Sequence, residues 1–207
     1  MKPLSDFSLE ARRRIRGVFT DIDDTLTTDG KLTARAYAAC EHLHDAGFQV
    51  IPITGRPAGW CDHIARMWPV DGVVGENGAF YFRYDPAART LTKRFLMSDR
   101  ERAANRRRLD ELRDEILARV PGTAVASDQL YREADLAIDY CEDVPELKRD
   151  AVGRIVAIMT AAGAKVWAPA RPLLWLAVLV SLVVLAFNFI VMPWANRELR
   201  DAIVAAL

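Results

Sequence analysis

The chain has 207 residues, 51% of them hydrophobic, and its 28 Lys and Arg balance its 28 Asp and Glu. This length and apolar content indicate one or two globular domains with an ample core. Because the net charge is zero, nothing in the overall charge favours nucleic acid as a partner, and we expect none. Three widely spaced cysteines, an odd number, are expected to stay reduced in a cytosolic setting: Cys40, Cys61 and Cys141.

Residues 1–14 are polar and rich in Arg, and they lack the apolar centre of a secretory signal, so we do not expect export. The apolar strand that follows ends in two carboxylates, Asp21 and Asp23. Because alternate residues of an extended chain point the same way, both are expected to emerge together at the strand's end. An isolated Asp-x-Asp also fits a solvated turn. An EF-hand fits poorly, because Leu26 stands where that loop needs Gly.

Two adjacent carboxylates suit phosphoryl transfer. One of them, beside a divalent cation, can attack phosphorus and form an aspartyl-phosphate. The other can protonate the departing alkoxide and later deprotonate the attacking water. Asp21 is therefore the candidate nucleophile, Asp23 is the candidate acid and base, and both are candidate metal ligands.

Two further apolar strands are expected downstream, separated by helical patterns. A helix over 33–46 leads to the strand 50–53, and a helix after Pro57, with Trp60, Ile64 and Met67 facing the core, leads to the strand 72–75. Such an order predicts a parallel sheet with a site at the carboxyl ends of its strands. The candidate phosphate- and substrate-binding residues there are Thr54, Gly55, Arg56 and Asn77.

With these motifs in order, the chain resembles the haloacid dehalogenase (HAD) superfamily of phosphohydrolases. The first motif is matched by Asp21-Ile-Asp23-Asp-Thr25 and the second by Thr54. The runs Thr-Gly-Arg-Pro and Glu-Asn-Gly-Ala are similar to the large-cap branch, which includes Cof-type, sucrose-phosphate and mannosyl-3-phosphoglycerate phosphatases. The resemblance covers roughly residues 13–168.

This resemblance implies an α/β fold with a Rossmann-like parallel sheet and an inserted α+β cap. It also implies Mg²⁺, held by the first Asp, the backbone carbonyl of the second and a later acid. The pattern stops near Lys165, because neither the family's Lys nor its Gly-Asp-x-x-x-Asp motif is recognisable beyond that point. We therefore expect an incomplete core, with only Glu198 and Asp201 as later acids.

The cap is expected over 80–168. It would contain a hairpin over 80–96, a helix that begins with a capping box at Ser98 and Glu101, a strand over 135–140 and a helix over 145–162. Three charged residues near the last strand are candidates for contact with a polyol, although ordinary surface charges explain them more simply: Arg132, Glu133 and Asp135.

Residues 172–194 carry no charge, and as a helix they would span roughly 34 Å at about 1.5 Å per residue, enough to cross a bilayer core of about 30 Å. We predict that this stretch is a transmembrane helix within a C-terminal segment, residues 169–207. Residues 1–170 are then expected in the cytoplasm. Of these, residues 1–79 are expected to form the N-terminal part of the core. A buried helix that replaces missing strands is one alternative. A frameshift, a fusion junction or a fragment is another.

Two functions stay open. The first is a Mg²⁺-dependent phosphomonoester hydrolase that acts on a small, sugar-like phosphate. The second is a catalytically silent, truncated or fused module attached to a membrane. The sequence leaves the oligomeric state undecided.

Overall fold

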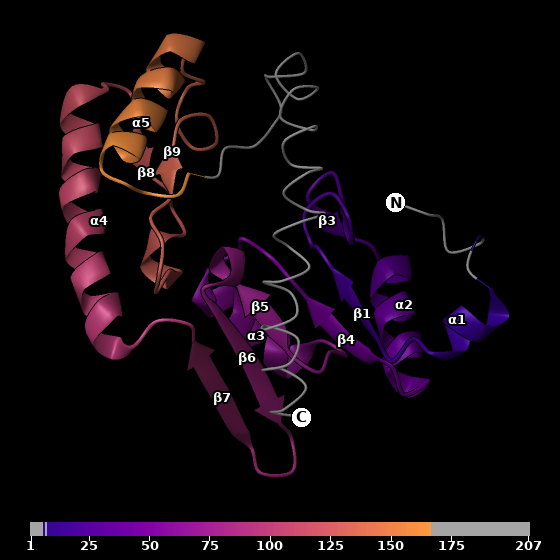
Figure 1. The fold of residues 1–207 in the computed structure, drawn as a ribbon. Helices are drawn as coiled ribbons and strands as arrows, with labels where there is room; N and C mark the ends of the chain where they lie inside the picture. Colours follow the sequence, from indigo (N-terminus) through magenta and orange to yellow (C-terminus); the bar gives the residue numbers. More distant parts are fainter. Residues whose placement is uncertain (1–5, 7, 167–207) are drawn as a thin grey trace. The chain divides into compact units, whose positions relative to one another are not determined.

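The computed structural model of the chain describes residue 6 and residues 8–166 (Figure 1). The chain divides into two compact units, Met1–Gly163 and Ala164–Leu207, and every element described below belongs to the first. The predicted membrane segment 172–194 lies outside the described residues. Within the described part, no helix is both long and apolar enough to cross a bilayer.

Parallel strand pairing forms the centre of the first unit. Strand β1 (Gly17–Thr20) pairs in parallel with β4 (Gln49–Pro52), and a parallel bridge between Ile53 and Val74 brings β5 (Val73–Gly75) alongside β4. The predicted α/β fold with a parallel sheet is thus confirmed. The connecting elements, in chain order, are β2 (Thr27–Thr28), β3 (Lys31–Leu32), α2 (Ala34–Asp45) and α3 (Ala58–Met67), and α1 (Leu9–Arg13) precedes β1.

An antiparallel hairpin extends this sheet beyond β5. Strand β6 (Phe80–Asp85) pairs with β5 on one side and with β7 (Thr90–Phe95) on the other. The carboxylate of Asp85 closes the turn, because its Oδ1 accepts hydrogen bonds from the backbone N–H groups of Ala87 and Ala88 at 2.9 and 3.0 Å. The predicted hairpin is therefore present, and it continues the sheet of β5. The boundary expected at 79/80 stays a prediction.

Helix α3 covers β5 and β6 with its apolar face. Cys61, Ile64, Phe80 and Phe82 are buried there, and the two phenylalanine rings stack with their centroids 4.3 Å apart. Burial raises the pKa of the Cys61 thiol to about 12, so this cysteine is chemically quiet at neutral pH.

The orientation predicted for α3 is only partly correct. Ile64 is buried as expected, whereas Trp60 is 46% exposed and Met67 is 64% exposed. Cys61 and Ala65 complete the buried face together with Ile64, because a helix repeats every 3.6 residues and these three positions share one side. The indole of Trp60 is therefore partly exposed on the outer side of α3.

The cap-like part follows β7. Helix α4 (Asp99–Arg119) begins with the predicted capping box, and it contacts α5 (Arg149–Ala161). Between the helices lie β8 (Ala124–Val125), a short 3₁₀ helix η3 (Gln129–Tyr131) and β9 (Ile138–Asp139), with β8 and β9 antiparallel. The strand expected over 135–140 is therefore only two residues long. The buried residues of the two helices are Leu112, Ile116, Ala151, Ile155 and Ile158.

Asp139 fixes the chain where β9 ends. Its carboxylate accepts three backbone hydrogen bonds of 2.8–3.0 Å, from Cys141, Glu142 and Asp143. Burial acts to raise the pKa of Asp139, but the backbone donors outweigh it, so the pKa is lowered. A lowered pKa in the folded state means that the stabilisation is present above the unfolded pKa of about 3.9 and is lost as the pH falls through the folded value.

We expect Asp139→Asn to lower the free energy of unfolding by about 2 kcal/mol at neutral pH, because hydrogen bonds to a charged group are lost. The difference between variant and wild type should shrink below a pH of about 4, as the wild-type carboxylate takes up its proton. Urea unfolding followed by circular dichroism at several pH values measures both effects. The exposed Glu142→Gln is the matched control, and an equal pH dependence in that variant would contradict the assignment.

Candidate active site

The two acids after β1 lie on the accessible side of their loop. Ile22, between them, is 5% exposed, whereas Asp21 is exposed and the side chain of Asp23 is 43% exposed. The Oδ1 atom of Asp21 accepts a hydrogen bond of 2.7 Å from the backbone N–H of Ile22. This bond orients one oxygen of the carboxylate and leaves the other open to solvent or a ligand.

The loop after β4 presents a buried hydroxyl. Thr54 is 3% exposed, and its backbone N–H donates to the carbonyl of Val74 at 2.9 Å, which ties the loop to β5. The hydroxyl oxygen accepts a bond of 3.1 Å from the backbone N–H of Arg56. The hydroxyl hydrogen is the part of Thr54 that could donate to a phosphate oxygen.

The loop after β5 contacts the loop that contains Thr54. The backbone N–H of Asn77 donates to the carbonyl of Thr54 at 3.2 Å, and the φ of Asn77 is +56°, a conformation that asparagine tolerates. A Cβ on Gly55 would lie 3.1 Å from Oδ1 of Asn77, so the glycine lets the amide come close. Thr54, Gly55, Arg56 and Asn77, predicted from the sequence as one phosphate-binding group, are thus gathered in one place. We call the segments 54–57 and 76–78 the phosphate loops, after the role predicted for these residues from the sequence.

Arg56 joins the phosphate loops to the first motif. Its Nε lies 3.2 and 3.1 Å from the two carboxylate oxygens of Asp23, and its Nη2 lies 2.5 Å from Oδ1. The guanidinium carbon lies 4.6 Å from the centre of the Trp60 ring, in a cation–π contact. The structure therefore pairs two residues that were predicted for separate tasks. Within the part of the chain that the structure describes, no hydrogen bond or ion pair joins the Asp21 side chain to the phosphate loops, although β1 and β4 end side by side.

The oxygen donors fit a hard divalent cation in kind. Mg²⁺ is commonly bound by one or two carboxylates, with water and substrate phosphate filling the other positions, and Asp21 and Asp23 offer such oxygens. Among the described residues, no group of three or more His, Cys, Asp or Glu is placed to hold a metal ion. The later acids Glu198 and Asp201 lie outside the described residues.

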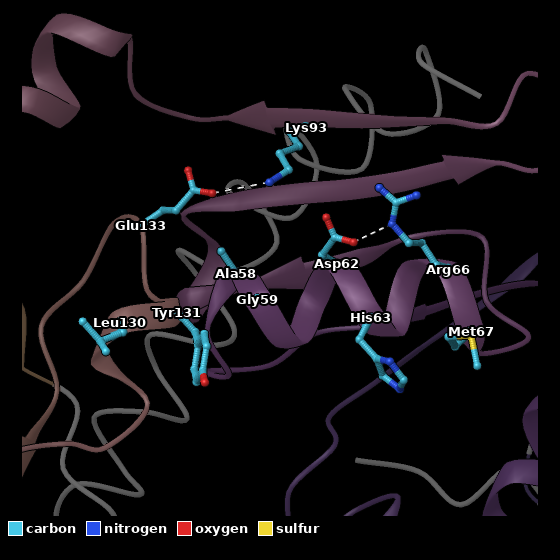
Figure 2. A pocket seen from close by; sticks show the side chains of 10 residues that line it. All are labelled: Ala58, Gly59, Asp62, His63, Arg66, Met67, Lys93, Leu130, Tyr131 and Glu133. Atoms are coloured by element: carbon cyan, nitrogen blue, oxygen red, sulfur yellow. Dashed lines mark hydrogen bonds and ion pairs between the residues drawn. The ribbon is translucent and has the colours of Figure 1, made fainter.

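An open groove of about 610 Å³ runs along the outer side of α3 (Figure 2). None of the predicted catalytic, metal-binding or phosphate-binding residues lines it, but Glu133, one of the three candidates for contact with a polyol, does. Two ion pairs are formed by residues that line it, Asp62 with Arg66 at 2.5 Å and Lys93 with Glu133 at 3.5 Å. The remaining lining residues are Ala58, Gly59, His63, Met67, Leu130 and Tyr131. Its volume lies within the range typical of ligand pockets, but its position places it beside the predicted site.

Sequence reasoning missed the importance of Glu76 and misjudged Arg132. Glu76 is 3% exposed and accepts hydrogen bonds from backbone N–H groups on two segments. The side chain of Arg132, expected at the surface, is only 11% exposed and pairs with Asp128 and Asp135. The one available signal for Glu76 was a charged residue placed directly after an apolar strand.

Residues 18–104 match a family described as haloacid dehalogenase-like hydrolase. A solved Thermoplasma acidophilum protein, 0175, is 16% identical with a TM-score of 0.54, over 75% of this chain and 61% of that one. A trehalose-6-phosphate phosphatase related protein is 18% identical with a TM-score of 0.47, over 73% and 63%. A Bacteroides thetaiotaomicron phosphatase of the HAD superfamily, BT1666, is 21% identical with a TM-score of 0.39, over 79% and 53%.

The chain therefore spans less than two thirds of the length of these three structures. At such identities, the similarity to the Thermoplasma protein shows a shared fold. No curated protein matches the sequence. The matched residues 18–104 include all three motifs on which the predicted site rests.

Proposed function

We propose that the chain is a phosphomonoester hydrolase that forms an aspartyl-phosphate on Asp21, because residues 18–104 match the haloacid dehalogenase-like hydrolase family. One observation carries this proposal. Neighbouring strands β1, β4 and β5 end in the two acids, in Thr54 and in the Glu76–Gly78 turn, so that carboxylates and phosphate-binding groups follow the same edge of the sheet.

The proposed reaction has two steps. A carboxylate oxygen of Asp21 attacks phosphorus, the bond from phosphorus to the ester oxygen breaks, and Asp23 gives its proton to the departing alkoxide. Asp23 then takes a proton from a water molecule as that water attacks the phosphorus of the aspartyl-phosphate. Inorganic phosphate leaves, and both side chains return to their starting states.

The phosphate loops supply the binding groups. The Thr54 hydroxyl, the Gly55 N–H and the Asn77 amide would donate to the phosphate oxygens, and the Arg56 guanidinium would balance their charge. In the substrate-free structure Arg56 is paired with Asp23. A bound phosphate competes for the same guanidinium, so substrate binding would release the Asp23 carboxylate, which then takes up from solvent the proton that it gives to the alkoxide.

Mg²⁺, held by Asp21 and the main chain at Asp23, would reduce the repulsion between the carboxylate and the phosphate when bound. The substrate would be a small, sugar-like phosphate, since a cap of the kind seen over α4, α5, β8 and β9 suits recognition of the part beyond the phosphate. Membrane attachment through residues 172–194, with residues 1–170 in the cytoplasm, is a further proposal. Resistance to carbonate extraction tests it.

A second candidate function is a binding module without turnover. One observation favours it: the Asp23 carboxylate is engaged by Arg56 in the substrate-free structure. Such a module would still hold a phosphorylated ligand on the phosphate loops.

Phosphate release from a panel of sugar phosphates and from p-nitrophenyl phosphate separates the two functions. The full chain, purified in detergent, is assayed with Mg²⁺ and with EDTA. We expect release that depends on Mg²⁺ and is greatest for a sugar phosphate. A folded chain that releases no phosphate from any compound would contradict the hydrolase and favour the binding module.

A further inference from the structure

Glu76 is a buried carboxylate that the proposed reaction does not use. It is 3% exposed and lies in the short 3₁₀ helix η2 (Glu76–Gly78), with a φ of +44°. That value is unusual for a residue with a long side chain and indicates that the surrounding contacts hold the backbone in place. Burial raises the pKa of Glu76, and the N–H groups that face it act in the opposite direction.

The carboxylate is shared between α3 and the cap-like part. Its Oε1 accepts bonds of 2.9 Å from the backbone N–H groups of both Ala58 and Glu133. Its Oε2 accepts from Ala134 at 2.6 Å and from Asp135 at 3.1 Å. Helix α3 has no side-chain cap of its own, so Glu76 satisfies one of the free N–H groups at its first turn.

Besides the hydrogen bonds of Glu76, a second contact ties the cap-like part to the phosphate loops. Nη1 of Arg132 donates to the carbonyl of Gly55 at 3.1 Å, and the guanidinium is held by Asp128 and Asp135. Gly55 lies in one phosphate loop and Glu76 in the other. Segment 132–135 of the cap-like part is therefore attached to both phosphate loops through groups that are largely buried.

We infer that Glu76 is a positioning residue, whose carboxylate locks segment 132–135 onto the phosphate loops and so holds Gly55 and Asn77 in the geometry that binds phosphate. This inference rests on the proposed function. Residues Leu130 and Tyr131, which are 94% and 57% exposed and line the groove of Figure 2, directly precede the locked segment. The lock thus also fixes one wall of that groove.

The substitution Glu76→Gln tests the lock. Glutamine offers one acceptor oxygen, and its NH₂ group would face N–H donors where Oε2 now accepts two bonds. We expect deuterium exchange at the amides of Ala134 and Asp135 to become at least about tenfold faster. We also expect KM for the best sugar phosphate to rise about tenfold while kcat changes less than about twofold, because phosphate binding is loosened while the reacting groups remain.

Glu111→Gln, on the exposed side of α4, is the matched control and should change neither quantity. If Glu76→Gln does not fold, Arg132→Lys opens the second tie, and the same exchange and KM changes are expected. Unchanged exchange at Ala134 and Asp135 would overturn the lock. A fall in kcat at constant KM would mean loss of folded enzyme alone and would overturn the positioning role.

Failure of the proposed function gives a different result. A wild-type chain without phosphate release contradicts the hydrolase, and the exchange at Ala134 and Asp135 then decides by itself whether the lock exists. Faster exchange in the variant supports it, and equal exchange overturns it.

Discussion

Replacing Asp21 with asparagine is expected to lower kcat for phosphate release by a factor of about 10⁴ or more, since removal of a covalent nucleophile has effects of this size or larger. The amide has no negative charge and attacks phosphorus poorly. Its side-chain oxygen can still accept the bond from the Ile22 N–H, so the fold should be kept. Phosphate release, together with acid trapping of radiolabelled phosphoenzyme, measures the loss of both turnover and intermediate.

The matched control is Asp24→Asn in the same loop. Asp24 is exposed, and its φ of +56° is a value that asparagine also adopts readily, so the same chemical change occurs without strain. We expect its activity to stay within a few fold of wild type. Turnover retained in Asp21→Asn, or lost equally in both variants, would remove Asp21 from the role of nucleophile.

The second large effect is expected at Gly75, the last residue of β5. A Cβ there would lie 2.4 Å from two ring atoms of Phe80 and 2.6 Å from Sγ of Cys61, and both side chains are buried. Such overpacking forces shifts in a dense core, and we expect Gly75→Ala to lower the free energy of unfolding by about 3 kcal/mol. Urea unfolding of the full chain measures the change.

Replacing Gly153 in α5 with alanine is expected to raise the stability of the chain, which is the opposite effect. Nothing lies within 4 Å of a Cβ built there, and the residue is exposed inside a helix. We expect Gly153→Ala to stabilise the chain by about 0.5–1 kcal/mol, because alanine has the higher helix propensity. A similar loss of stability in both variants would show that the clash at Gly75 is not the cause.

The sequence predicted well those features that depend on near neighbours. The capping box at Ser98 and Glu101 and the hairpin around Asp85 were identified because the interacting groups lie three residues apart or less. The parallel sheet followed from apolar strands separated by helical patterns. The four residues grouped as phosphate-binding proved to be adjacent, although their function is still a proposal.

Features that depend on distant neighbours were not predictable in the same way. Glu76 meets its cap-side donors 57 to 59 residues further along the chain, and those donors are backbone N–H groups that leave no mark on residue types. Arg132 was expected at the surface for the same reason, since its contact with Gly55 spans 77 residues. In α3, Trp60 and Met67 fit an apolar face by spacing, and only the packing against β5 and β6 shows which face is buried.

The contact between Trp60 and Arg56 gives the site an optical reporter. The indole is 46% exposed, and its ring lies under the guanidinium that pairs with Asp23. If a phosphate draws Arg56 away, the polarity around the indole changes, and so does its fluorescence. In a chain whose other four tryptophans are replaced by phenylalanine, the emission of Trp60 would report occupancy of the phosphate loops directly, whether or not any bond is broken.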